Sequence, residues 1–209
     1  FDWGNIHLQR RAGENALTVF SASVARYPAS ARLQVGLGIA QYSRGKYSEA
    51  VASFCRAVDL DPSDPRPYDF LGEIYGIAPE LASEVTERLA GFVKAQPRNA
   101  MAHLYYALSL WRGQRTQSAP EDLRRVETLL KRAVTLDPTL ARGFLELGIF
   151  LADQVRYAEA IEQLVRATRL QPGVPQAHYR LAQAYRRTGQ TALAEKELEI
   201  FQRLKADTR

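Results

Sequence analysis

Cysteine is almost absent from this sequence, and its scarcity limits what can hold the fold together. Only Cys55 among the 209 residues is a cysteine, so no disulfide can form within the chain. It lies in a helical pattern without a cationic cluster or a histidine beside it, which favours a packing thiol over a nucleophile. The lack of disulfides fits a reducing compartment and slightly favours the cytoplasm, although exported helical proteins also lack them.

Long apolar runs and targeting signals are missing as well. No run approaches 18 apolar residues, so no membrane span is expected, and no secretory signal peptide can be recognised. Because the chain opens at Phe1 and not at a methionine, we expect a mature or trimmed fragment whose targeting segment could have been removed. The sequence therefore leaves the compartment open, export after signal removal included.

Neither sign of charge dominates the chain. It has 28 Lys and Arg residues against 23 Asp and Glu residues, which gives a net charge of +5. Most of the basic residues alternate with acidic ones along helical patterns, and this predicts a solvated surface of mixed charge. The hydrophobic fraction of 46% is ordinary for a folded globular protein.

Signatures of catalysis and of cofactor binding are also absent. The sequence has no HExxH, no CxxC and no EF-hand run. The segment Gly36-Leu37-Gly38 lacks the third glycine of a dinucleotide fingerprint, and Gly45-Lys46 lacks the first glycine and the Ser or Thr of a phosphate loop. We therefore expect no catalytic residue, no metal site and no cofactor.

What the sequence does contain is an internal repeat. Five prolines recur at spacings of 34, 35, 41 and 34 residues, namely Pro28, Pro62, Pro97, Pro138 and Pro172. The positions 12, 8 and 5 residues before each proline are mostly occupied by small or apolar residues. These offsets place the three positions on one face of a helix. Earlier in each unit a large residue precedes a small one, as in Leu147-Gly148, and the small member lets a neighbouring helix approach closely.

At these positions the sequence resembles the tetratricopeptide repeat family, most clearly in Gln34–Pro62 and Phe144–Pro172. The resemblance covers essentially the whole chain and implies an all-α fold, a superhelical solenoid of about five to six helical hairpins. Departures are Gln34 and Gln41, where an aromatic or apolar residue is usual, and Phe92, where alanine is usual. We expect a single solenoid over 1–209 with units at 1–30 (partial), 31–64, 65–99, 100–140, 141–174 and 175–209.

Two segments depart from the regular repeat. The fourth unit carries about seven extra residues between Trp111 and Asp122, which predict a longer surface turn, either a tolerated insertion or a partner contact. Within it, Ser118-Ala-Pro-Glu121 is typical of a capping box that opens the next helix.

The last helix carries an apolar face, formed by Leu193, Leu198, Phe201 and Leu204. Stacked repeats normally need a polar cap at each end. This face could bind a partner or a second copy of the chain, or the charged residues around it could shield it. Self-association through this helix therefore stays open.

The histidines His7, His103 and His178 are far apart in the sequence. His103 and His178 occupy one repeat slot, which Tyr68 and Phe144 fill in sister units. A slot filled by aromatic residues elsewhere favours a role in helix packing over a metal or catalytic role.

The resemblance also implies a binding surface, because the leading helices of this family line a concave groove. The corresponding positions here are Val35, Ile39, Tyr42, Asp69, Glu73, Leu104, Leu108, Trp111, Leu145, Ile149, Tyr179, Gln183 and Arg186. They are mostly apolar, with an acidic patch in the second full unit and a basic end, as a peptide-holding groove requires. Alternatively, about half of the apolar ones pack against adjacent helices.

A specialised subfamily clamps acidic C-terminal tails with a Lys and an Asn one helical turn apart. The equivalent slots here hold Val35 with Ile39 and Asp69 with Glu73, so this specialised reading is disfavoured.

The resemblance and the groove together predict a non-enzymatic scaffold that binds a protein or peptide. One alternative is an RNA-binding helical array, suggested by the +5 charge and by Arg124, Arg125, Arg186 and Arg187, although an apolar groove disfavours nucleic acid. Another is the recruitment arm of a larger enzyme whose catalytic domain lies outside this chain, suggested by the partial first unit.

Overall fold

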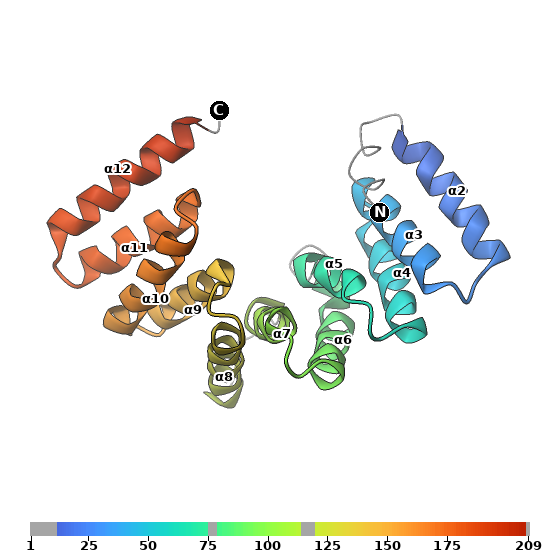
Figure 1. Ribbon diagram of the computed structural model, residues 1–209, viewed down its shortest axis with the longest axis horizontal. Coiled ribbons are helices and arrows are strands. Elements are labelled where there is room, and N and C mark those ends of the chain that lie inside the picture. Colours follow the sequence, from blue (N-terminus) through green and yellow to red (C-terminus); the bar gives the residue numbers. More distant parts are fainter. Residues whose placement is uncertain (1–11, 75–78, 114–119, 208–209) are drawn as a thin grey trace. The chain divides into compact units, whose positions relative to one another are not determined.

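The computed structural model describes residues 12–74, 79–113 and 120–207, and every regular element among them is a helix (Figure 1). The predicted all-α fold is therefore confirmed. The chain divides into two compact units, Phe1–Val126 and Glu127–Arg209, and the division falls inside α8. The expectation of one continuous solenoid over the whole chain stays a prediction. None of the described helices is both long enough and apolar enough to cross a membrane.

The first unit is a series of antiparallel helical hairpins. Helix α3 packs against α2 on one side and α4 on the other, and α5, α6 and α7 pack against one another. The elements are α2 (Ala12–Arg26), α3 (Ala31–Ser43), α4 (Tyr47–Leu60), α5 (Arg66–Ile74), the 3₁₀ turn η1 (Pro79–Leu81), α6 (Ala82–Ala95), α7 (Ala100–Gly113) and the start of α8 (Pro120–Leu136).

The second unit is also a series of helical hairpins. Helix α10 packs against α9 and α11, and α11 packs against α12, as the ribbon also shows (Figure 1). After the rest of α8 the elements are α9 (Ala141–Asp153), α10 (Tyr157–Leu170), α11 (Pro175–Arg187) and α12 (Thr191–Asp207).

The repeated apolar positions form the core. In the four trailing helices α4, α6, α8 and α10, the residues 12, 8 and 5 positions before the closing proline are all buried: Ala50, Phe54, Ala57, Val85, Leu89, Phe92, Val126, Leu130, Ala133, Ala160, Leu164 and Ala167. Their offsets of four and three residues set them on one helical stripe, and burial of that stripe away from water is the main force that holds a hairpin together.

Glycine in the large–small pairs allows the two helices of a hairpin to touch. A Cβ atom on Gly38 would lie 2.6 Å from the Phe54 ring, and one on Gly148 would lie 2.6 Å from Cγ of Leu164. Carbon atoms do not approach so closely, so any larger residue in these two slots would push the trailing helix away.

One ring-bearing slot ties three of the leading helices, α5, α7 and α11, to the turn before each of them. The Tyr68 hydroxyl donates to the Pro62 carbonyl at 3.2 Å, and Nε2–H of His103 and of His178 donates to the carbonyls of Pro97 and Pro172 at 3.0 and 2.9 Å. All three side chains are buried. This geometry agrees with the helix-packing role expected for the two histidines.

Polar contacts between successive trailing helices occur at about one repeat length. Arg88 on α6 pairs with Asp59 on α4, and Nη1 of Arg156 lies 2.8 Å from Oε2 of Glu127 on α8. The Ser48 hydroxyl donates to Glu80 at 2.9 Å. Such partly exposed contacts add little stability individually, but they fix the register between neighbouring hairpins.

Three sequence expectations lie outside the described residues. They are the packing role of His7, the Ser118 cap of the extra segment, and most of that segment itself. Helix α8 begins at Pro120, within the segment predicted to open a helix.

Candidate interaction surface

Five of the thirteen predicted groove residues are buried. Their relative exposure lies between 0% and 7%, and they are Val35, Leu104, Leu108, Leu145 and Ile149. The reason is clearest in α7 and α9, where every residue of 102–110 and of 143–151 is buried. A helix that is covered all round offers no stripe to a ligand, so these side chains can support a surface only from beneath.

The other eight predicted residues reach solvent. Ile39, Tyr42 and Trp111 are half-buried, whereas Asp69, Glu73, Tyr179, Gln183 and Arg186 are exposed. They fall into two groups, one on α3, α5 and α7 of the first unit and one on α11 of the second. These eight are the residues that a bound chain could touch.

In the first unit, an aromatic cluster joins α3 to α5. The ring of Tyr42 lies edge-on to Tyr47 at 5.5 Å between centroids and to Phe70 at 5.8 Å. Phe70 in turn stacks on the buried ring of Phe54 at 4.8 Å. The half-buried Tyr42 ring is therefore restrained by its contacts with Tyr47 and Phe70. A restrained side chain loses little conformational entropy when a ligand binds to it.

A carboxylate stands beside this cluster. Asp69 precedes Phe70 on α5 and accepts a hydrogen bond from the buried Tyr105 hydroxyl of α7. Tyr105 can lie this close because Gly72 has no side chain; a Cβ atom there would sit 2.2 Å from the tyrosine ring. Burial raises the pKa of the Asp69 carboxyl, and the charge of Glu73 raises it further, while the Tyr105 hydrogen bond lowers it.

Trp111 is the last of the solvent-reaching residues in the first unit. It is half-buried near the end of α7, and the guanidinium carbon of Arg112 lies 4.7 Å from its ring centroid. This cation–π contact holds a flat aromatic side chain in place at the protein surface.

The second unit presents a different chemistry. The ring of Tyr179 is 39% exposed and lies 5.2 Å from that of Phe201 on α12. Nη1 of Arg180 donates to Oε1 of Gln183 at 3.4 Å. Helix α11 carries three arginines and no acidic residue, and Arg186 and Arg187 stand in its last turn. The exposed surface of α11 thus combines an aromatic residue with positive charge, in contrast to the first unit.

The described residues contain no group of three or more His, Cys, Asp or Glu side chains that could hold a metal ion. Cys55 is 3% exposed, and burial, followed by the charge of Glu84, raises the pKa of its thiol to about 12. At neutral pH that thiol is protonated and unfit as a nucleophile. Buried Nδ1 of His103 has no hydrogen-bond partner, while Nδ1 of His178 lies 2.6 Å from Oε2 of Glu197.

Sequence reasoning missed three residues that shape the first surface: Tyr47, Phe70 and Tyr105. Tyr47 was missed because it lies on the trailing helix α4, and the stripe was placed on leading helices alone. Phe70 and Tyr105 lie on leading helices but one position after predicted stripe residues, and their aromatic character beside those positions was the available signal. Tyr105 follows Leu104, and Phe70 follows Asp69.

Comparison with known sequences gives one family and one related protein. The sequence profile described as Tetratricopeptide repeat matches residues 1–65, 87–141 and 145–207. Lipopolysaccharide assembly protein B of Escherichia coli (strain K12) is 31% identical over 132 residues, which are 62% of this chain and 33% of that protein. The match thus spans about a third of the relative's length.

Solved structures show the same fold at low identity. A structure of pilF from Pseudomonas aeruginosa has a TM-score of 0.66 and 21% identity, covering 86% of this chain and 78% of that one. MamA from Desulfovibrio magneticus RS-1 gives 0.63 and 21%, with 82% and 92% covered. YrrB, described as a TPR protein with an unusual peptide-binding site, gives 0.59 and 20%, with 90% and 93% covered.

Proposed function

Because this chain belongs to the tetratricopeptide repeat family, we propose that it is a non-enzymatic scaffold that holds a peptide or a helix on its leading helices. The repeat fold serves protein–protein interaction, and the finer proposal concerns which residues make the contact. We assign contact to the eight solvent-reaching residues of the predicted groove. We assign to the five buried ones the task of holding those eight in position.

One observation carries the proposal: the half-buried ring of Tyr42 contacts those of Tyr47 and Phe70, and the charged residue Asp69 precedes Phe70 on α5. Binding energy at protein interfaces concentrates in rigid aromatic and arginine anchors ringed by polar groups. Tyr179 beside Arg180 repeats this combination in the second unit. Catalysis is not part of the proposal, since neither the buried thiol of Cys55 nor the packed histidines offer a reactive group.

The test is selection from a displayed library of short peptides, with the purified chain as bait. We expect wild type to enrich a defined set of sequences. Tyr42→Glu and Tyr179→Glu each introduce a charge on one of the two surfaces, and each should lose part of that set. Leu108→Glu would be a poor test, because it places a carboxylate at a fully buried position and destabilises the fold.

A matched control is Leu170→Glu, which makes a similar change at an exposed apolar side chain of the trailing helix α10. It should keep the full enriched set. Circular dichroism of every variant shows whether the helices remain. Equal enrichment by wild type and by both folded tyrosine variants would refute the groove proposal.

The RNA alternative makes a different prediction. Phosphate contacts release counterions, so binding to RNA should weaken steeply as salt is raised. The first unit places Asp69 and Glu73 on its leading-helix surface, where a phosphate backbone would be repelled. A gel shift at low salt decides between the two, and we expect no shifted band.

We also propose that α12 is a secondary contact surface, open to self-association. Leu193 is 44% exposed on it, and Leu198, Phe201 and Leu204 are half-buried. Sedimentation velocity over a range of concentrations tests this. A concentration-dependent dimer that Leu193→Glu removes would support it, and a monomer at every concentration would exclude it.

A further inference from the structure

Acidic charge is concentrated in one part of the first unit. Residues 47–95 contain nine acidic and four basic residues, a net charge of −5, whereas the whole chain carries +5. Of those four basic residues, Arg66 is paired with Asp64 and Arg88 with Asp59. The local excess of negative charge therefore falls on α4, α5 and α6, within a chain that is otherwise basic.

Two of these acidic residues, Asp69 and Glu73, lie on α5, the helix that contributes Phe70 to the aromatic cluster. We name the α3–α5 face by its residues Ile39, Tyr42, Asp69, Phe70 and Glu73. The Tyr42–Phe70 ring contact joins the two helices, and Asp69 and Glu73 stand one turn apart on α5. The charge of Glu73 raises the pKa of the Asp69 carboxyl, so both carboxylates contribute negative potential to this face.

The carboxylate of Asp69 is also oriented by a hydrogen bond. The Tyr105 hydroxyl from α7 donates to its carboxylate, and the nearest cation along α5, Arg66, is held by Asp64 with Nε 2.8 Å from Oδ1. A carboxylate fixed by a buried donor loses little freedom when it accepts a second charged partner.

We propose that the α3–α5 face selects a separate protein partner whose bound segment presents a Lys or Arg side chain next to an aromatic or aliphatic one, with the cation received by Asp69. The apolar neighbour packs on Tyr42 and Ile39, and Glu73 adds a second negative charge. Tyr105 is the positioning residue that aims the Asp69 carboxylate. This inference rests on the proposed function, because it names the chemistry of the partner on that same surface.

The test begins with the peptides that wild type enriches from the displayed library. We expect Lys or Arg beside an apolar residue in those that Tyr42→Glu loses. One such peptide is then synthesised in two forms, with its basic residue intact or replaced by Gln, and the Kd of each is measured by fluorescence anisotropy at low and high salt.

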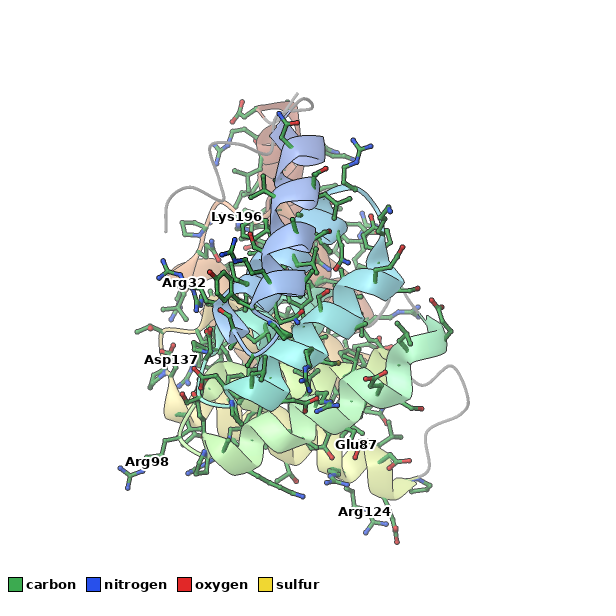
Figure 2. The ribbon with its side chains drawn as sticks, turned by 90° about the vertical axis from the view of Figure 1, so that its right-hand side faces the viewer. Arg32, Glu87, Arg98, Arg124, Asp137 and Lys196 are labelled. Atoms are coloured by element: carbon green, nitrogen blue, oxygen red, sulfur yellow. The ribbon has the colours of Figure 1, made fainter. Side chains whose placement is uncertain are left out.

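Asp69→Asn removes the charge with almost no change of shape. It should raise the Kd of the basic peptide about five- to tenfold and leave that of the Gln peptide unchanged. Tyr105→Phe should reduce the preference for the basic peptide over the Gln peptide, a ratio that a general loss of folding would not change selectively. The matched control is Glu87→Gln, the same loss of charge on an exposed α6 residue, labelled in Figure 2, and it should bind as wild type does.

The possible failures can be told apart. If no peptide is enriched, the proposed function fails and this inference fails with it. If peptides bind through Tyr42 but the basic and Gln forms bind equally, or if Asp69→Asn and Glu87→Gln behave alike, only the inference is wrong. If wild type self-associates and Asp69→Asn abolishes that association, the occupant is a second copy and the proposal of a separate partner is overturned.

Discussion

Val155 adopts a backbone conformation that glycine adopts in two sister repeats. It stands between α9 and α10 with φ of 62°, and the equivalent turns place Gly45 at 71° and Gly189 at 76°. A β-branched residue with positive φ is a genuine outlier, because its Cβ crowds the backbone. The sequence could not reveal this directly, since valine does not signal such a turn, although the glycines of the sister repeats could have flagged the position.

Replacing this valine should stabilise the protein. Val155→Gly relieves the strain and loses little packing, because the side chain is 69% exposed, so we expect a gain of about 1 kcal/mol in unfolding free energy. The measurement is the urea midpoint. Gly189→Val should shift it the opposite way, and a Val155→Gly variant no more stable than wild type would contradict the assignment.

Asp64 illustrates a charge whose contribution depends on pH. Its side chain is 8% exposed, and it accepts from the guanidinium of Arg66 at 2.8 Å and from the Arg66 backbone N–H at 3.0 Å. The Arg66 hydrogen bond holds the pKa of this carboxyl below its usual 3.8. Because the folded-state pKa is depressed, the stabilisation is complete above 3.8 and is lost as pH falls through the lowered folded-state pKa.

The corresponding variant is Asp64→Asn, which keeps the oxygen that caps α5 and removes the charge. We expect a loss of about 1 kcal/mol at pH 7, kept small because Arg66 is 38% exposed. The difference from wild type should shrink as pH falls below about 4, which thermal melts across the acid range would measure. A difference that stays constant with pH would show that the charge is not its source.

The effect of replacing a glycine by a larger residue depends on how closely a neighbouring helix packs against it. In α9 a Cβ on Gly148 would meet Leu164 at 2.6 Å and the Ala160 carbonyl at 3.2 Å, whereas a Cβ on Gly91 in α6 would have nothing within 4 Å. The sequence predicted the first case, because Gly148 follows a large residue in phase with Gly38. It gave no warning about the second.

The two glycines should therefore respond in opposite directions to alanine. Gly148→Ala should lower stability by about 1 kcal/mol, since overpacking outweighs the better helix propensity, and Gly91→Ala should raise it by about 0.5–1 kcal/mol. Chemical denaturation of both variants checks this. If both variants are more stable than wild type, α9 and α10 approach each other less closely than the 2.6 Å distance from a Gly148 Cβ to Leu164 requires.

The burial of the proposed groove residues could be predicted from the sequence only in part. Helical periodicity can say that Leu104 and Leu108 share a face of α7, but not whether another helix covers that face. Coverage depends on neighbours, and α7 and α9 proved to be buried over nine consecutive residues each. The partial burial of Tyr42 and the donor from Tyr105 to Asp69 depend likewise on contacts between helices that lie far apart in sequence.

For the whole chain, the repeat was the strongest signal. Proline spacing, the large–small pairs and the buried stripes identified an all-α repeat protein, because each of these regularities reflects the same hairpin packed on its neighbour. Chemistry is less regular than packing. The acidic excess of 47–95 and the arginines of α11 distinguish the two units, and no repeat rule predicts which ligand each surface prefers.

The central claim is that leading helices, and not trailing ones, hold the ligand. The most direct measurement is an NMR titration of isotope-labelled wild type with a selected peptide, read separately for each unit. We expect saturable shifts of backbone amides in α3 and α5, or in α11, with those of α4, α6 and α10 much smaller. Shifts that gather on the trailing helices, or that never saturate, would contradict it.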